Sequence, residues 1–298
     1  MSSSAAELDQ KTHSRRQEVL GSDDSNTLLT LNNLIIDTRE SGEFVKASRQ
    51  QEEALERSLA AFQYPDNPTV MRASRNLAVA QRKAGEHTRA LELSLDTVER
   101  YRRRYGDDYP DTMSASLNLA IDSRHAGNLD EARKLGEKTL QRYRSILGEQ
   151  HPHTLAAQVN LAIVIRQLGD AQGAYRSDRE SLDALNERLG PDHPSTLTCA
   201  TNLASDLFAM GDAQAAFDLD TDTLARSERI LGVEHPSTLA VGVNLALDLR
   251  ALGREQEADL LHADNMARFR RSLGDQHPAT LNALKSLRAD CDIDPMPL

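Results

Sequence analysis

One asparagine recurs along this chain at a nearly constant spacing, and its amide group could hold the backbone of an extended peptide. A side-chain amide both donates and accepts hydrogen bonds, so a row of them can bond the N–H and C=O groups of a peptide without reading its sequence. Such an asparagine can equally bond a neighbouring helix and help to set the geometry of the protein itself. We expect peptide binding along the row, which consists of Asn33, Asn76, Asn118, Asn160, Asn202 and Asn244.

Charged residues accompany the asparagines at fixed distances. Four residues on, about 40° around a helix, most positions hold aspartate, which is uncommon in helix interiors. These carboxylates would favour basic or amine-bearing ligand side chains, and they are Asp37, Asp122, Asp206 and Asp248. Six residues after the asparagine, roughly 120° away from it, most repeats carry arginine and one carries Phe208. We expect these arginines to pair with acids of an adjacent helix, and Phe208 to serve in ordinary packing.

The histidines invite a metal or acid–base interpretation, but their spacing argues against it. His151, His193, His235 and His277 occupy the same turn of successive units, which lie roughly 10 Å apart in a stack of helices. Ligands of one zinc ion must each lie about 2 Å from it, so these side chains cannot converge. Because the chain also lacks a nucleophile elbow, an H-E-x-x-H motif and a phosphate-binding loop, we expect no catalytic residue, no metal site and no cofactor.

A repeat of constant length must position the asparagines. Proline recurs at 68, 110, 152, 194, 236 and 278, always 42 residues apart. Proline suits the first turn of a helix and glycine suits the residue just beyond its end, and two glycines recur in each unit. Each unit is therefore predicted to form two antiparallel helices, so the chain should be all-α, a stack in which each unit buries its apolar face against its neighbours.

The repeat accounts for nearly the whole chain. We predict an array over residues 1–290, with six full units at about 21–277, a leading half-unit at 7–20 and a closing first helix at 278–290. Residues 291–298 are predicted to form a flexible C-terminal tail, because the final stretch holds two prolines and three acids. The alternative is that this tail packs on the last helix or occupies a groove as a ligand of its own chain.

The motif His-Pro-x-Thr-Leu followed by Asn-Leu-Ala, as in residues 235–246, resembles the 42-residue tetratricopeptide repeat of the kinesin light chain type. The resemblance implies a right-handed superhelical solenoid whose first helices line a concave groove, where asparagines contact an extended peptide. The Arg-, Asp- and Ala-rich composition is also similar to that of actinobacterial repeat arrays associated with signalling nucleoside triphosphatases or with FxSxx-COOH peptide-maturation systems.

Net charge and cysteine content indicate which classes of partner and which cellular location to expect. The formal net charge of -11 argues against binding to nucleic acid or an anionic membrane. Cys199 and Cys291 are the only cysteines, so we expect a reducing, cytoplasmic location. We therefore predict a non-enzymatic adaptor that binds a protein or peptide segment in its groove. The alternative is a self-assembly or regulatory module for a signalling ATPase or a peptide-maturation system, and self-association is left open.

Overall fold

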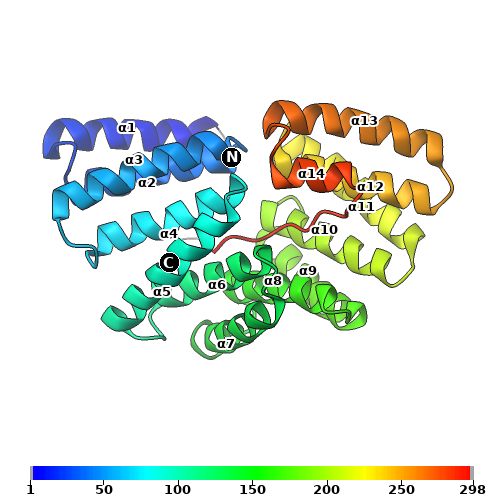
Figure 1. Cartoon of the computed structure of the whole chain (residues 1–298), viewed down its shortest axis with the longest axis horizontal. Coiled ribbons are helices and arrows are strands. Elements are labelled where there is room, and N and C mark those ends of the chain that lie inside the picture. The colour runs from blue at the N-terminus through cyan, green and yellow to red at the C-terminus, as the bar shows by residue number, and fades with distance from the viewer. Residues whose placement is uncertain (1–2, 296–298) are drawn as a thin grey trace. The chain divides into compact units, whose positions relative to one another are not determined.

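The computed structural model describes residues 3–295, and within that range it contains helices and no strands (Figure 1). The helices are α1 (Ser3–Leu20), α2 (Ser25–Glu40), α3 (Phe44–Phe62), α4 (Pro68–Lys83), α5 (His87–Tyr105), α6 (Pro110–His125), α7 (Leu129–Leu147), α8 (Pro152–Gln167), α9 (Ala171–Leu189), α10 (Pro194–Ala209), α11 (Ala213–Ile230), α12 (Pro236–Ala251), α13 (Glu255–Ser272) and α14 (Pro278–Leu284). None of the described helices is both long enough and apolar enough to cross a membrane.

The chain divides within α6 into two compact units, one ending at Asp122 and the other beginning at Ser123. In the N-terminal unit, the helices from α1 to α5 pack in chain order, each against the next. The large buried side chains of this unit include Leu28, Met71 and Tyr101. Burial raises the pKa of the Tyr101 hydroxyl to about 12, so this ring stays neutral inside the unit.

In the C-terminal unit, the helices from α7 to α14 also pack consecutively, and the first helices α8, α10 and α12 additionally contact one another. Their apolar side chains, such as Leu155, Ile163 and Leu239, are buried. The first helices therefore stand side by side, and one face of each is brought into a common row. The helix pairs and their order confirm the all-α stack of antiparallel helices predicted from the repeat.

The recurring histidine begins a helix in this structure. The Nδ1 atom of His193 accepts a hydrogen bond from the backbone N–H of Ser195 at 3.1 Å, just before Pro194 opens α10. The same contact recurs at His151, His235 and His277. An N-terminal cap satisfies a backbone donor that the helix itself leaves open. Burial lowers the pKa of His193, which favours the neutral ring that this accepting role requires.

The closing helix is shorter than predicted. The sequence indicated a helix over 278–290, whereas α14 ends at Leu284. Ser286 takes a left-handed conformation with φ of 54°, and the N–H of Leu287 bonds back to the carbonyl oxygen of Asn282. This bonding pattern terminates a helix even without the usual glycine. The chain then leaves α14 and continues in an extended conformation.

Candidate functional site

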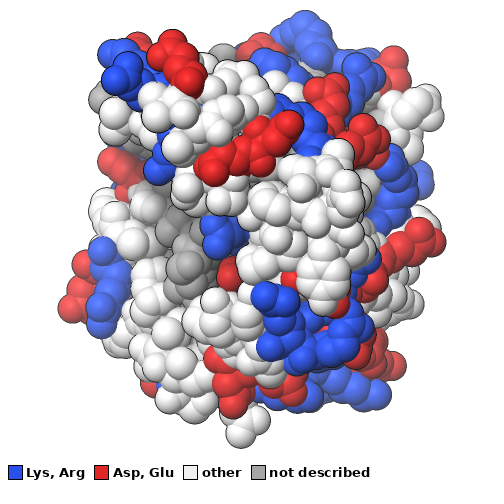
Figure 2. Space-filling view, turned by 90° about the vertical axis from the view of Figure 1, so that its left-hand side faces the viewer, with Lys and Arg blue, Asp and Glu red and all other residues white. Residues whose placement is uncertain are grey.

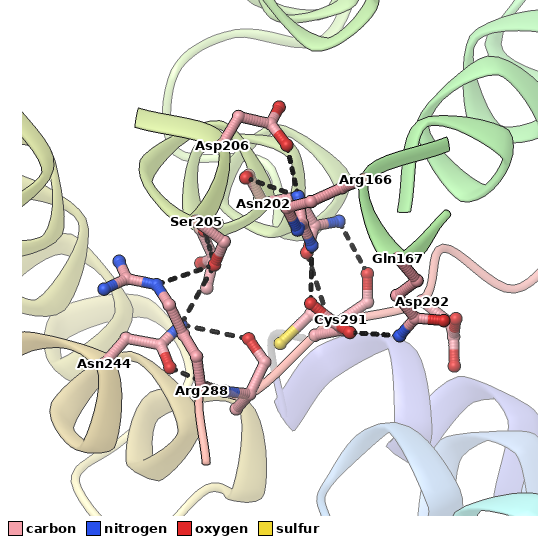
Figure 3. Close-up of polar contacts among 12 residues, drawn as sticks. Arg166, Gln167, Asn202, Ser205, Asp206, Asn244, Arg288, Cys291 and Asp292 are labelled. Atoms are coloured by element: carbon pink, nitrogen blue, oxygen red, sulfur yellow. Dashed lines mark hydrogen bonds and ion pairs between the residues drawn. The ribbon is translucent and has the colours of Figure 1, made fainter. Parts of the chain in front are cut away.

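The end of the chain lies on the row of asparagines in the C-terminal unit. We call residues 288–293 the tail segment, and the surface that carries Asn160, Asn202 and Asn244 the asparagine face. The extended red segment of Figure 1 crosses the first helices of this unit. Each of these three asparagines bonds both backbone groups of one tail residue, as Figure 3 shows for Asn202 and Asn244.

The three contacts follow one pattern. The amide of Asn244 accepts from the N–H of Ala289 at 2.7 Å and donates to its carbonyl oxygen at 3.0 Å. Asn202 does the same for Cys291 at 3.0 and 2.8 Å, and Asn160 for Ile293 at 3.1 and 2.8 Å. Because alternate residues are held, the tail segment is bonded along one edge, as a strand would be. It runs from α12 through α10 to α8, opposite to the order of the repeats.

The first side chain of the tail segment enters a cluster of acids. Arg288 donates to Asp248 on α12 and to Asp220 on α11, each at 2.5 Å, and to the hydroxyl of Ser205 at 2.9 Å. Its guanidinium also lies over the ring of Phe208, 4.7 Å from the centroid. Both carboxylates are fully buried and Arg288 is nearly so, with 12% of its side chain exposed. This subsite is built for a basic, planar group.

The two aspartates of the tail segment contact arginines of the recurring series that lies six residues after the asparagines. Asp290 accepts from Arg166 at 2.5 Å and from the side-chain amide of Gln167 at 2.7 Å. Asp292 accepts from Arg124 and lies at the same distance, 2.7 Å, from Nε2 of His125. Contacts of this kind between charged groups are shorter and stronger than neutral hydrogen bonds. This end of the asparagine face therefore suits carboxylates.

An apolar contact closes the site. Ile293 is buried and packs with Leu155, Val159 and Cys199 of α8 and α10. The tail segment thus presents an arginine, two carboxylates and one branched aliphatic side chain, and each contacts a surface of matching chemistry.

The sequence-based expectation of a flexible tail differs from the structure over residues 291–295, while residues 296–298 lie outside the described residues.

Paired carboxyl groups lie beneath the asparagine face. Burial raises the pKa of Asp178 well above its usual range, and the neighbouring Asp206 carboxyl raises it further. Burial also raises the pKa of Asp206 to about 6, against the opposing effect of Arg166. Asp220 and Asp248 repeat the arrangement around Arg288, with both pKa values raised by burial. The second-helix carboxyls, those of Asp178 and Asp220, are therefore the ones we expect to hold the proton at neutral pH.

Replacing Asp178 with asparagine should stabilise the protein at neutral pH. A carboxyl whose pKa is raised on folding contributes stability below its unfolded pKa and loses it as the pH rises through the folded value. The new amide could donate to Asp206 without taking up a proton, so urea unfolding of Asp178→Asn should give a gain of about 1 kcal/mol or more at about pH 7.5. The gain should disappear near about pH 4. A loss of stability at both pH values would show that the wild-type pair does not share a proton.

In the N-terminal unit the corresponding residues bond within the protein. Asn76 donates to Asn32 at 3.4 Å, and Asn118 accepts from Arg82 at 3.2 Å. Asp122 accepts from Arg82 at 2.6 Å and from Ser94 at 2.5 Å. These asparagines follow the architectural interpretation that the sequence left open.

The first members of the two predicted series lie on α2. Asn33 and Asp37 are both half-buried there. Burial and the negative charges of Asp9 and Glu40 raise the pKa of Asp37. The fully buried asparagine of α2 is instead the adjacent Asn32, which also accepts from Gln51 at 2.6 Å.

The arginine series pairs with acids of a neighbouring helix, as expected from the sequence, but the particular partners were not predicted. Arg82 and Arg166 each bond the aspartate of the next first helix, Asp122 and Asp206. The signal was present in the sequence, since arginine and aspartate recur with a constant separation of 40 residues. Their 120° offset on one helix hid the contact, because a long arginine side chain reaches around the helix to its neighbour.

Two features of the described part of the chain bear on other chemistries, namely potential metal ligands and the distribution of surface charge. Among residues 3–295, no group of histidine, cysteine and acidic side chains is placed to hold a metal ion. On the surface that Figure 2 shows, basic and acidic side chains are intermingled rather than gathered by sign.

Comparison with known families agrees with the fold. Models of the tetratricopeptide repeat match residues 112–174, 154–229 and 199–264, and a further model of that repeat matches 70–111. These segments span more than half of the chain, which therefore belongs to the tetratricopeptide repeat family. Its repeats are similar to those of a putative kinesin light chain. A search of curated proteins gave no match.

Solved structures include similar arrays. The Q17M crystal structure of putative kinesin light chain repeats from Podospora anserina is 28% identical, with a TM-score of 0.53, and the match covers 68% of this chain and 95% of that one. The match to BtubC from P. vanneervenii is 20% identical, with a TM-score of 0.54 and coverage of 79% and 92%. NprR in complex with its cognate peptide NprX is 16% identical, with a TM-score of 0.65 and coverage of 83% and 68%. At such low identity the last two show similarity of fold alone.

Proposed function

We propose that this protein is a non-enzymatic adaptor that binds an extended segment of a partner protein along its asparagine face. The observation that supports the proposal most directly is the paired bonding of Asn160, Asn202 and Asn244 to alternate backbone units. An amide that bonds both groups of one residue supplies affinity for any extended chain, while the surrounding pockets supply specificity. The peptide complex named for the similar NprR structure is consistent with this use of the fold.

Loss of the asparagines should abolish partner capture. In the variant Asn160→Ala/Asn202→Ala/Asn244→Ala, each missing amide leaves a donor and an acceptor of the bound backbone without a partner. Affinity should fall by about tenfold or more for each site, since an unmade hydrogen bond in a buried contact costs roughly 1–3 kcal/mol. The measurement is affinity capture from native cell extract with wild type and variant, followed by mass spectrometry of the retained proteins.

A matched control separates this effect from a general loss of amides. Asn186 and Asn282 are exposed on α9 and α14, and Asn186→Ala/Asn282→Ala should retain every partner. Circular dichroism should show unchanged helicity in both variants. Partners captured equally by wild type and the triple variant would move the function to another surface and leave the asparagine row as architecture.

A further inference from the structure

The ladder of ion pairs has two gaps in the C-terminal unit. Arginine and aspartate pair at a separation of 40 residues in Arg82–Asp122 and Arg166–Asp206. By the same spacing, the partner of Asp248 would be residue 208, which is phenylalanine. The partner of Arg124 would be residue 164, which is valine. One buried acid thus lacks its ladder arginine, and one arginine lacks its ladder acid. A buried charge left in this way is costly unless another group pairs with it.

The tail segment fills both gaps. Arg288 reaches Asp248 and stacks on Phe208, the residue that replaces the ladder arginine. Asp292 reaches Arg124 at 2.7 Å, and its side chain is only 5% exposed. Asp290 adds a second acid to Arg166. At the two gaps, Asp248 and Arg124 therefore bind side chains of opposite charge on the occupant. The asparagines bond the backbone of the occupant.

The contacts of the tail segment are those of a bound peptide rather than of a core element. Between Leu287 and Pro295, Ile293 alone is fully buried. The segment's other contacts described above are backbone amide bonds, charge pairs and the stacking of Arg288 on Phe208, and water can bond the polar groups when the segment leaves. Residues 285–287 are exposed and connect the segment directly to α14. Such a short tether holds a displaceable ligand at an effective concentration on the order of millimolar.

We propose that the asparagine face selects partner segments with an arginine, carboxylates two and four residues later, and a branched aliphatic residue directly after the second carboxylate. The tail segment, Arg288–Ala–Asp–Cys–Asp–Ile293, occupies the face as an internal copy of that ligand, and a partner binds by displacing it. This inference rests on the proposed adaptor function and adds to it the chemistry of the partner and its competition with the chain's own end.

The test uses a labelled synthetic peptide covering residues 286–295, with Cys291→Ser to prevent disulfide formation. Full-length protein carrying Asp290→Arg/Asp292→Arg should bind it, since the new arginines repel Arg124 and Arg166 and free the face. Wild type should bind the peptide about tenfold or more weakly, because its own tail segment competes. Fluorescence anisotropy measures both affinities. Absence of binding to both chains at millimolar concentration would overturn the proposal.

Changes in the peptide test the pattern without altering the protein. Arg288→Glu or Asp292→Lys in the peptide should each weaken binding to the released chain, the one with Asp290→Arg/Asp292→Arg, by about tenfold or more, since each removes a hydrogen bond to a charged group. A change at the exposed Leu287, Leu287→Ala, should leave affinity unchanged. Equal affinity for the charge-reversed and parent peptides would show that the face does not read charge, and would overturn the stated pattern.

Filling the gap at residue 208 provides a complementary test in the protein. In the released chain, Phe208→Arg should pair with Asp248 as Arg166 pairs with Asp206, and so occupy the arginine subsite. The parent peptide should then bind about tenfold or more weakly, whereas a peptide carrying Arg288→Ala should bind the released chain equally well with and without Phe208→Arg. Loss of affinity for both peptides alike would instead indicate a general defect and contradict an arginine subsite.

The outcomes separate this inference from the adaptor function. Capture of partners that depends on the asparagines, together with no binding of the tail peptide, would sustain the adaptor and overturn the ligand pattern. A wild-type dimer that becomes monomeric in Asp290→Arg/Asp292→Arg, measured by light scattering, would make a second copy the occupant and overturn the partner claim. A monomeric wild type whose tail peptide binds with the stated charge dependence supports the inference.

Discussion

Replacing Arg288 with alanine should lower the free energy of unfolding by about 3 kcal/mol at about pH 7.5, because it leaves buried acids without their only basic partner from the tail segment. Asp220 and Asp248 are fully buried and both contact this guanidinium. Hydrogen bonds to Ser205 and the stacking on Phe208 are lost as well. Urea unfolding followed by circular dichroism measures the effect.

The loss should shrink as the pH falls. Burial already raises the pKa values of both carboxyls, and removal of a nearby positive charge raises them further. The native variant therefore binds more protons than wild type does, and it gains stability relative to wild type as the pH falls from about 7.5 to about 5. A destabilisation that is the same at both pH values would contradict this explanation.

Two further variants sharpen the Arg288 experiment. Arg288→Ala/Asp248→Asn should recover most of the lost stability, since it removes the carboxylate that the guanidinium neutralises while the Asp220 carboxyl holds its proton. Arg226→Ala breaks an exposed pair with Asp222 on α11, where the two atoms lie 2.9 Å apart. It should change the free energy of unfolding by less than about 0.5 kcal/mol. The contrast distinguishes a buried subsite from the general loss of an arginine.

The repeat predicted the helices well because it encodes local physics. Proline at the first turn of α8 and the left-handed glycine that follows α9, Gly190 with φ of 88°, are local signals that recur in the units between residues 68 and 277. The periodic asparagines could be found by the same means. Helix order, helix ends and the row of candidate amides were therefore predictable from the sequence.

The tail segment could not be predicted in this way. Its prolines and acids indicate disorder when they are considered locally, yet Ile293 bonds Asn160, 133 residues away in the chain. No glycine marks the end of α14 at Leu284 either. What orders this segment is complementarity with a surface formed only after the repeats have stacked. The capping role of the recurring histidines was likewise not predicted, because it depends on the side-chain geometry.

The two units give the asparagine and aspartate series different roles. In the N-terminal unit, Asn118 and Asp122 are satisfied by Arg82 within the ladder itself. In the C-terminal unit, Asn202 and Asn244 bond a segment from outside the helix pairs. The same motif is thus bonded within the ladder in the N-terminal unit, and to the tail segment in the C-terminal unit, where the ladder lacks a member.

The Arg82–Asp122 pair provides the strongest test of the architectural role. Its two side chains are 1% and 0% exposed and lie 2.6 Å apart. Arg82→Met and Asp122→Leu should each cost about 3–5 kcal/mol, because each removes one member of a buried ion pair. The double variant should cost far less than the sum of the two, since it buries apolar groups of similar volume in place of both charges.

A double-mutant cycle measured by urea unfolding gives the coupling between the two residues. The exposed pair of Arg133 and Glu137 on α7, 2.8 Å apart, serves as the control, and its coupling should stay below about 0.5 kcal/mol. Strict additivity at Arg82 and Asp122 would show that the ladder does not stabilise the N-terminal unit through paired charges. A large coupling there would mean that an unfilled ladder position carries a real energetic penalty, which is the condition that makes the gaps at residues 164 and 208 able to select a ligand.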